Sequence, residues 1–347
     1  MKRIKAALGI MACAVAGGAA AQTNVTAMGL VDMFAGTSQL SGVAQRSAVV
    51  GSGGMTTSWF GFKGSEELGG GLRAEFALTG FFRGDTGSSG RFNGDNLFSR
   101  DANIGLAGSF GKVQVGRGLA PNFLPTVLFN PFGDSFTFSP LVLHADMSGS
   151  AAWGGATNAA DTGWSNQVVY SSPKFAGLSA NVHYQFGEVA GQASTNNVGA
   201  NLLYFSGPVG LTAFYHDTNV SNPNPVVTPN KQKTAFVGAS YDFKVLKLAA
   251  TVQRNDNESA AGGARTSLDK TWSLGAWVSA GGGNVLAAYA KTERDLASAP
   301  DLTRSTFSLG YDWFLSKRTD VYAIAMNDKL AGYDHEMSYG LGLRHRY

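Results

Sequence analysis

The stretch that decides the fold is Gly118–Asn166, which reads GLAPNFLPTVLFNPFGDSFTFSPLVLHADMSGSAAWGGATNAADTGWSN. It connects two strand-like segments, and compact domains rarely contain a structureless connection of this length. The stretch is rich in Phe, Leu and Val and is broken by Pro121, Pro125, Pro131 and Pro140, so it does not resemble a disordered tail. We therefore expect it to be ordered, to fold inward and to line the lumen of a barrel whose wall is the rest of the chain.

The rest of the chain alternates apolar residues with small or polar residues at a period of two, which is typical of strands. In Thr303–Leu315 the odd positions are mostly apolar or aromatic, and the even positions are mostly small, polar or charged. Leu178–Phe186 alternates in the same way, and its aromatic residues stand at the strand end, where a membrane interface would place them. The aromatic face is therefore interpreted as the outside of a barrel.

About sixteen such segments occur, an even number within the range of bacterial barrels that hold a water-filled lumen. They are Asn24–Gly36, Thr57–Leu68, Leu72–Phe82, Arg100–Ala107, Lys112–Arg117, Gln167–Ser171, Leu178–Phe186, Asn196–Phe205, Leu211–Asp217, Lys233–Phe243, Lys247–Asn255, Thr271–Ala280, Asn284–Glu293, Thr303–Leu315, Thr319–Asn327 and His335–Tyr347. Short turns alternate with long loops such as Thr37–Thr56 and Asp256–Lys270, which is the plan of an outer-membrane barrel. The predicted fold is all-β: a transmembrane antiparallel β-barrel of about 16 strands with its long third loop in the lumen.

The N-terminus has the features of a cleaved signal peptide, residues 1–21: Lys2, Arg3 and Lys5, then an apolar core, then small residues before Gln22. The apolar core is shorter than the roughly 20 residues of a spanning helix, and too few apolar residues precede Cys13 for a lipoprotein signal. The expected domain is the barrel at residues 22–347, with a constriction loop at about 118–166. After cleavage, 27 minus 3 leaves 24 basic against 24 acidic residues, which gives no support for a nucleic-acid partner.

The sequence contains no recognisable catalytic, cofactor or metal motif. The five histidines are scattered, the single cysteine is Cys13, and the glycines follow no phosphate-binding pattern. We therefore expect no enzyme activity, no cofactor and no metal site.

Several motifs resemble one family. They are GSEELGGGL at 64–72, IGLAGSFG at 104–111 with Gly116-Arg117, YSSPKFAG at 170–177, LSKRTDVY at 315–322 and the ending GLRHRY at 342–347. In this order they are similar to the general diffusion porins of Gram-negative bacteria, most of all the beta-proteobacterial branch. The resemblance implies a homotrimer in the cell outer membrane, surrounded by membrane lipid and lipopolysaccharide and inserted by the outer-membrane assembly machinery. It also implies a water-filled channel for passive diffusion of ions and small hydrophilic solutes.

The resemblance further implies a constriction with an acid on the inward loop and arginines on the facing wall. Arg100 and Arg117 match family arginines, and Asp134 matches the loop acid. Trp59 stands where the family usually has a wall arginine, and Val169 replaces another. We therefore expect only a mild preference for anions.

Strand parity adds Arg73 and Lys63 to the lumen, on the same face as Trp59. Arg100 shares its parity with Ile104, which alone indicates the lipid face. The resemblance instead implies that Arg100 faces the lumen and that Asp101 and Asn103 face a neighbouring subunit.

Two further expectations concern assembly. The terminal aromatic residue Tyr347 resembles the assembly signal of the family. Strand one carries Ala27 and Gly29 beside Val31 and Met33 on one face, which favours close packing against a neighbour. Two other functions remain open on the sequence: a barrel that acts mainly as a surface adhesin or structural anchor, and a soluble secreted β protein.

Overall fold

The computed structural model describes residues 24–145, 151–153, 160–191, 195–224 and 227–347, so the expected signal peptide lies outside the described residues. The strands are β1 Asn24–Ser38, β2 Ser47–Ser52, β3 Trp59–Gly69, β4 Leu72–Arg83, β5 Ser88–Ser89, β6 Asp101–Gly108, β7 Gly111–Leu119, β8 Gly163–Ser171, β9 Leu178–Phe186, β10 Asn196–Ser206, β11 Val209–Val220, β12 Val227–Asp242, β13 Leu246–Ser259, β14 Arg265–Ala280, β15 Gly283–Leu296, β16 Leu302–Phe314, β17 Thr319–Leu330 and β18 Glu336–Arg346. Two short helices, α1 Phe123–Leu128 and α2 Pro140–Ala145, and a 3-10 turn at Ala151–Trp153 lie between β7 and β8. No helix in this described part of the chain is long and apolar enough to cross a membrane.

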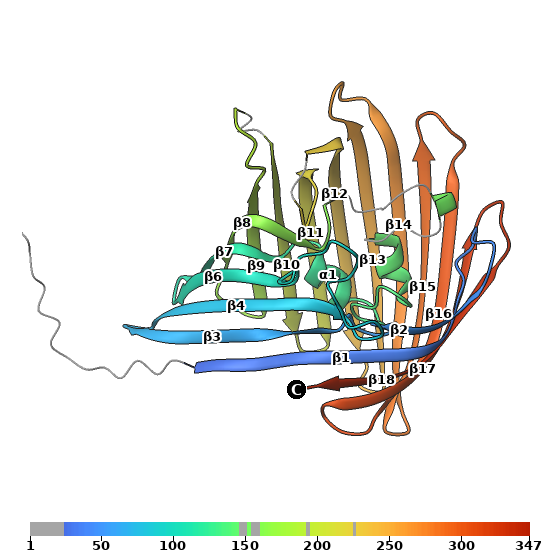
Figure 1. Ribbon diagram of the computed structural model, residues 1–347, viewed down its shortest axis with the longest axis horizontal. Coiled ribbons are helices and arrows are strands. Elements are labelled where there is room, and N and C mark those ends of the chain that lie inside the picture. The colour runs from blue at the N-terminus through green and yellow to red at the C-terminus, as the bar shows by residue number, and fades with distance from the viewer. Residues whose placement is uncertain (1–23, 146–150, 154–159, 192–194, 225–226) are drawn as a thin grey trace, which may run out of the picture.

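The strands form one antiparallel sheet that closes into a barrel (Figure 1). Closure occurs because β1 pairs with β18 on one side and with β2 and β3 on the other. β2 and β3 pair with successive parts of β1 and so share one wall position. The two-residue β5 pairs only with the end of β4 and adds no wall position. When β2 and β3 are counted as one position and β5 is left out, the eighteen strands give sixteen wall positions, which confirms the predicted barrel.

Burial alternates along the strands as the sequence pattern predicts. In β16, Thr306 and Ser308 are buried, whereas Phe307, Leu309 and Trp313 on the other face are 43%, 48% and 49% exposed. A soluble sandwich would bury the aromatic face instead. The polar face is buried here because a loop fills the lumen behind it, so the exposed aromatic face is the lipid-facing outside.

Two expected loops are wrong in their bounds. The segment expected to be a loop at 37–56 contains β2, which pairs with β1 from Met33 to Ser38. The loop expected at 256–270 is only the connection between β13 and β14, residues 260–264. The strands extend further because charged pairs such as Arg265 with Asp256, at 2.7 Å, continue the cross-strand contacts after the apolar alternation has ended.

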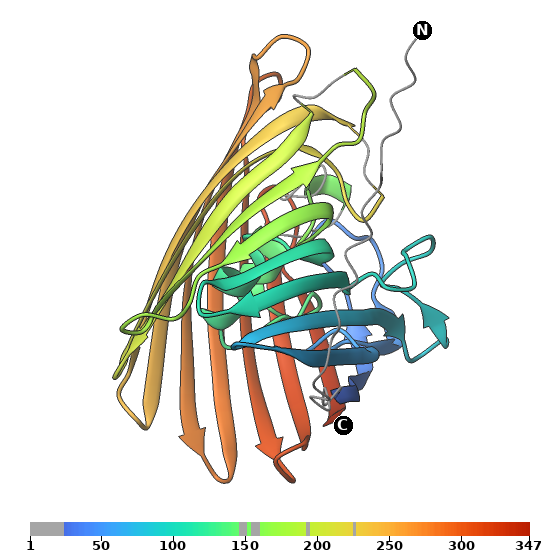
Figure 2. The ribbon, with the colours of Figure 1, turned by 90° about the vertical axis from the view of Figure 1, so that its left-hand side faces the viewer.

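The long connection between β7 and β8, residues 120–162, is the inward loop. Its helices lie inside the barrel, behind the strands of the wall (Figure 2). The loop is shorter than the expected 118–166 because β7 continues to Leu119 and β8 begins at Gly163. The predicted inward course of the loop is confirmed.

Apolar packing holds the inward loop against the wall of β1 and β15 to β17. Phe132, Phe138 and Leu143 of the loop form one buried cluster with wall residues that include Phe34 and Ile324. Full burial of three such side chains contributes roughly 5 to 9 kcal/mol, taken as an upper value. A Cβ at Gly340 of β18 would meet the Phe138 ring at 2.7 Å, so a residue without a side chain permits this close approach.

Hydrogen bonds anchor the same loop at several points. The Ser308 hydroxyl donates to the Phe138 carbonyl oxygen at 2.7 Å. The two ring nitrogens of buried His144 each lie 2.8 Å from a wall hydroxyl, one of Thr292 and one of Thr306. The buried guanidinium of Arg304 donates to the Leu143 carbonyl oxygen at 3.3 Å and pairs with Asp328. The loop is therefore fixed along β15 and β16, and space remains on the opposite side of the lumen.

Candidate pore constriction

The space that remains is a cavity of about 480 Å³ between the inward loop and the wall of β3 to β10. The inward loop contributes Ala120 and Leu124 to its lining. The ionisable residues of the lining are Lys63, Glu75, Asp101, Lys112, Arg117 and His183. Val169, the other departure from the family pattern, also lines the cavity. The charged side chains of this lining surround an open space between the inward loop and the wall.

Arg100 lies above Trp59 on the lumen side. Its guanidinium carbon is 4.1 Å from the centroid of the Trp59 ring, and its Nη1 donates to Asp101 Oδ2 at 2.8 Å. The Thr79 hydroxyl donates to the same carboxylate oxygen at 2.6 Å. Trp59 therefore does not merely replace an arginine, because its ring supports another one.

The expectation that Asp101 and Asn103 face a neighbouring subunit is wrong, since both line the cavity. Arg100 precedes the first residue of β6, so strand parity does not govern it. Its side chain turns back over the lumen, while Asp101 and Asn103 take the lumen face inside the strand. This is how Arg100 and Asp101 can both point inward although they are adjacent.

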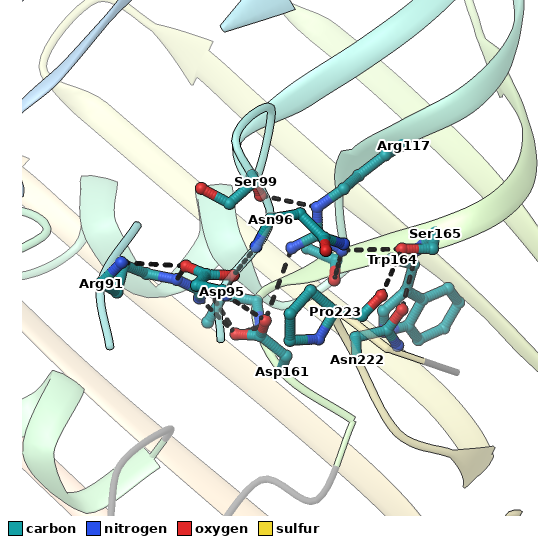
Figure 3. A network of polar contacts seen from close by, with 12 residues as sticks. Arg91, Asp95, Asn96, Ser99, Arg117, Asp161, Trp164, Ser165, Asn222 and Pro223 are labelled. Atoms are coloured by element: carbon teal, nitrogen blue, oxygen red, sulfur yellow. Dashed lines mark hydrogen bonds and ion pairs between the residues drawn. The ribbon is translucent and has the colours of Figure 1, made fainter. Parts of the chain in front are cut away.

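Arg117 is buried at the base of the inward loop, where it joins a polar network (Figure 3). Its Nε donates to the Ser99 carbonyl oxygen at 2.6 Å, and its Nη1 donates to the Gly163 carbonyl oxygen at 3.1 Å. Asp161 lies 3.6 Å from Nη2 and is also held by both terminal nitrogens of Arg91, each at 2.9 Å. Arg117 thus lines the cavity and also ties the loop base to the wall.

The loop between β4 and β6 contributes Arg91 and Asp95 to this network. Arg91 Nε donates to Asp95 Oδ2 at 2.9 Å (Figure 3). Burial alone would raise the pKa of Asp95, but the hydrogen bonds and charge of Arg91 outweigh it and hold the pKa below its ordinary value. Asp95 therefore stays ionised at neutral pH and keeps Arg91 in position.

Asp134 lies at the tip of the inward loop. Its carboxylate is hydrogen-bonded to the Thr56 side chain and is within electrostatic reach of Arg344 and Arg100. Arg344 Nη1 donates to Thr56 Oγ1 at 2.9 Å, and Arg344 also pairs with Asp320 at 2.8 Å. Arg344 was not assigned to the constriction from the sequence. Only its parity in β18 pointed inward, and nothing in the sequence brings it near Asp134.

Lys63 and Arg73 lie further along the pore wall. Lys63 is four residues from Trp59 in β3, about 13 Å along the strand, and Arg73 is six residues from Thr79 in β4, about 20 Å. Arg73 pairs with Glu75 at 3.4 Å, whereas Lys63 lines the cavity and makes no ion pair with a described residue. The structure therefore brings Arg100, Trp59 and Asp134 together and leaves Arg73 near the β3–β4 turn.

Tyr347 follows β18 and extends its pairing with β1, where the barrel closes. Its backbone N–H donates to the Gly29 carbonyl oxygen at 3.1 Å, and its carbonyl oxygen accepts from the Gly29 N–H at 3.3 Å. A Cβ at Gly29 would meet the Tyr347 hydroxyl at 2.5 Å, so the aromatic ring lies across this glycine. The terminal residue is thus part of the closing seam between β1 and β18.

A closed barrel with a lipid-facing aromatic exterior and an internal loop that narrows a polar lumen defines a channel protein of the outer membrane. Across the described residues, no group of three or more His, Cys, Asp or Glu side chains could hold a metal ion.

Comparison with known proteins gives the family. The model of the Gram-negative porin family matches residues 6–332. Outer membrane porin protein 32 of Delftia acidovorans is 31% identical over 331 residues, which cover 93% of this chain and 88% of the relative. An outer membrane porin protein of Bordetella pertussis is 27% identical over an alignment of 403 positions that covers 100% of both chains. The solved structure of the anion-selective porin from Comamonas acidovorans is similar with a TM-score of 0.76 at 25% identity, covering 94% of this chain and 100% of that one.

The chain therefore belongs to the Gram-negative porin family. It is an integral outer-membrane β-barrel that forms a porin channel. The proteins of this family are channels rather than enzymes.

Proposed function

We propose that this porin lets ions and small hydrophilic solutes diffuse passively, with a mild preference for anions. The observation that carries the proposal is the charge of the cavity. Its lining holds three basic residues, Lys63, Lys112 and Arg117, against two acidic ones, Glu75 and Asp101, so 3 minus 2 leaves a formal charge of +1. Fixed charges that line a narrow aqueous path set its ion preference.

The pairing of these charges favours the same sign. Glu75 is held by Lys112 at 3.3 Å, and Asp101 is held by Arg100 at 2.8 Å. Lys63 has no such partner in the described part of the chain, so its charge acts most directly on a passing ion. The preference stays mild because Arg100 and Arg344 are themselves paired with acids and because the Asp134 carboxylate is within electrostatic range of both. The similarity to a porin that is itself anion-selective agrees with this sign.

Reversal potentials in a salt gradient across planar bilayers test the proposal. We expect Arg100→Ala to weaken the anion preference, because Asp101 then loses its partner, and the double variant Arg100→Ala, Arg117→Ala to weaken it further. Trp59→Arg should strengthen it by adding a charge beside Arg100. If the wild type and these variants gave one reversal potential, Arg100, Arg117 and Trp59 would not border the ion path.

We propose further that the porin is a homotrimer, with membrane lipid and lipopolysaccharide around its outer face. The outward face of β1 carries the exposed Ala27, and the outward Ile104 and Val115 of β6 and β7 are 63% and 54% exposed. Together they offer an exposed apolar surface on which neighbouring barrels can pack. Light scattering in mild detergent should give the trimer mass, and a monodisperse monomer would contradict this proposal.

We also infer that Tyr347 is the signal read by the outer-membrane assembly machinery. The position of Tyr347 at the seam between β1 and β18 supports this role. Deleting Tyr347 should sharply reduce the amount of porin in the outer membrane, whereas Tyr339→Ala, an outward aromatic of the same strand, should not. Normal surface levels of the deletion variant would contradict the inference.

A further inference from the structure

The wall position shared by β2 and β3 is interrupted by residues 53–58, the strand break. In the β1 register, Met33 faces Ser52 and Leu30 faces Trp59. β1 therefore advances by three residues (33 minus 30) while the facing chain advances by seven (59 minus 52). Four residues have left the sheet, whereas an ordinary β-bulge adds one.

The strand break projects into the lumen and contacts the inward loop. Met55 is 3% exposed and belongs to the apolar cluster that the loop forms with the wall. The Ser135 hydroxyl donates to the Gly54 carbonyl oxygen at 2.6 Å, and the Thr137 hydroxyl donates to the Gly53 carbonyl oxygen at 2.9 Å. The tip of the inward loop therefore rests on the strand break as well as on the regular wall.

Asp32 of β1 supplies the hydrogen bonds that the strand break loses when it leaves the sheet. Its side chain is fully buried, and its Oδ2 accepts from the backbone N–H groups of Met55 at 2.8 Å and Thr56 at 2.7 Å. The Tyr322 hydroxyl of β17 donates to the other carboxylate oxygen. The Asp32 carbonyl oxygen accepts from the Gly53 N–H at 2.8 Å. Buried backbone groups need partners, so this carboxylate fixes the course of the strand break.

Thr56 connects the strand break to the charges of the constriction. Its side chain is bonded to both Asp134 of the inward loop and Arg344 of β18. The acid and the base are thus held on either side of one threonine. A shift of the strand break would move Thr56 and change the separation of the two charged groups.

We propose that the strand break is the support on the wall that sets the position of the inward-loop tip, and hence the width of the pore, and that Asp32 is the positioning residue that holds the strand break in the lumen. The width of the pore is then set by two segments that rest on each other, the loop tip and the strand break. This inference concerns pore width, so it does not depend on the sign of the ion preference.

The test is a deletion that rejoins β2 and β3. Removal of Gly54–Thr57 leaves Gly53 opposite Asp32 and Ser58 opposite Val31, which restores a continuous strand without changing its parity. We expect the single-channel conductance in planar bilayers to rise about 1.5-fold or more, because the loop tip can move into the space that the strand break leaves and so widen the path on its other side. Unchanged or lower conductance of the folded variant would overturn the proposal.

Asp32 variants separate positioning from general stability. Asp32→Ala should raise the conductance and the current noise, whereas Asp32→Asn keeps an oxygen that accepts from Met55 and Thr56 and should behave as wild type. In the deletion background Asp32→Ala should have no further effect on conductance, because the segment it holds is absent. An Asp32→Ala effect that persists in that background would overturn the positioning role.

Folding of every variant is checked by the heat-modifiable migration of the barrel on gels. If the deletion variant does not fold, Gly54→Ala replaces it, because the added methyl group would overlap the Tyr322 hydroxyl and push the strand break from its position. The matched control is Gly262→Ala, which has open space around its Cβ position in the β13–β14 connection. The proposal requires altered conductance for Gly54→Ala and wild-type conductance for the control, and equal conductance of the two variants would refute it.

Discussion

Neutralising Lys63 should reduce the anion preference by a calculable amount. A sphere of 480 Å³ has a radius of about 5 Å, so an ion at the cavity centre lies about that far from the wall. Two unit charges 5 Å apart interact by about 0.8 kcal/mol in water, and salt at 0.1 M reduces this to about 0.5 kcal/mol. Because the lysine attracts anions and repels cations, the difference is about 1 kcal/mol, or about fivefold in the permeability ratio.

We therefore expect Lys63→Gln to lower the anion-to-cation permeability ratio by up to about fivefold at 0.1 M salt, and by less at 1 M, where the Debye length is about 3 Å. Reversal potentials at a fixed salt ratio and two absolute concentrations measure both effects. Lys291→Gln is the control, because Lys291 pairs with Glu293 at 2.8 Å on the outer face of β15. A ratio unchanged by Lys63→Gln, or an equal shift in the control, would refute the reasoning.

Two further predictions concern stability. Arg304 and Asp328 form an ion pair in which both side chains are 1% exposed, so Arg304→Ala should destabilise the barrel by about 3 to 5 kcal/mol by leaving a buried carboxylate unpaired. Lys270→Ala, in a pair whose side chains are 50% and 44% exposed, should cost at most about 1 kcal/mol; urea unfolding in detergent measures both, and similar losses would contradict the burial argument. Asp95 has a lowered pKa, so its ion pair with Arg91 stabilises the fold above the ordinary carboxyl pKa and is lost as the pH falls through the lowered value. The unfolding midpoint should therefore decrease on acidification below about pH 4 and decrease less in Asp95→Asn, and parallel pH profiles would show that the pair contributes nothing.

The barrel could be predicted from the sequence because a period of two reports directly which face of a strand meets lipid. The inward loop could be predicted because its apolar residues need a surface to pack on, although the residues that receive it could not. Gly340 accommodates Phe138, and Thr292 and Thr306 bind His144, across more than a hundred positions of sequence. Their identities alone do not distinguish an anchor from any other lumen residue.

The constriction was only partly predictable. Arg100 lies in the lumen because its side chain turns back just before a strand begins, a position where parity does not apply. Arg117 matches the family pattern, but its burial in the loop-base network is a tertiary property. The strand break resembles an ordinary loop in sequence, since glycine, threonine and serine are common in loops. Only the pairing of β2 and β3 with the same strand shows that it interrupts a wall.

The claim that ions pass between the inward loop and the wall of β3 to β10 can be tested most directly with one matched pair of cysteine variants. The only cysteine of the chain is Cys13, so each of the two variants is made separately in a Cys13→Ala background. Ser65 lines the cavity, whereas Ser308 is fully buried behind the loop against the Phe138 carbonyl oxygen. A charged thiol reagent added during single-channel recording should lower the conductance of Ser65→Cys and leave Ser308→Cys unchanged. The reverse pattern would place the ion path on the other side of the inward loop and contradict this structure of the pore.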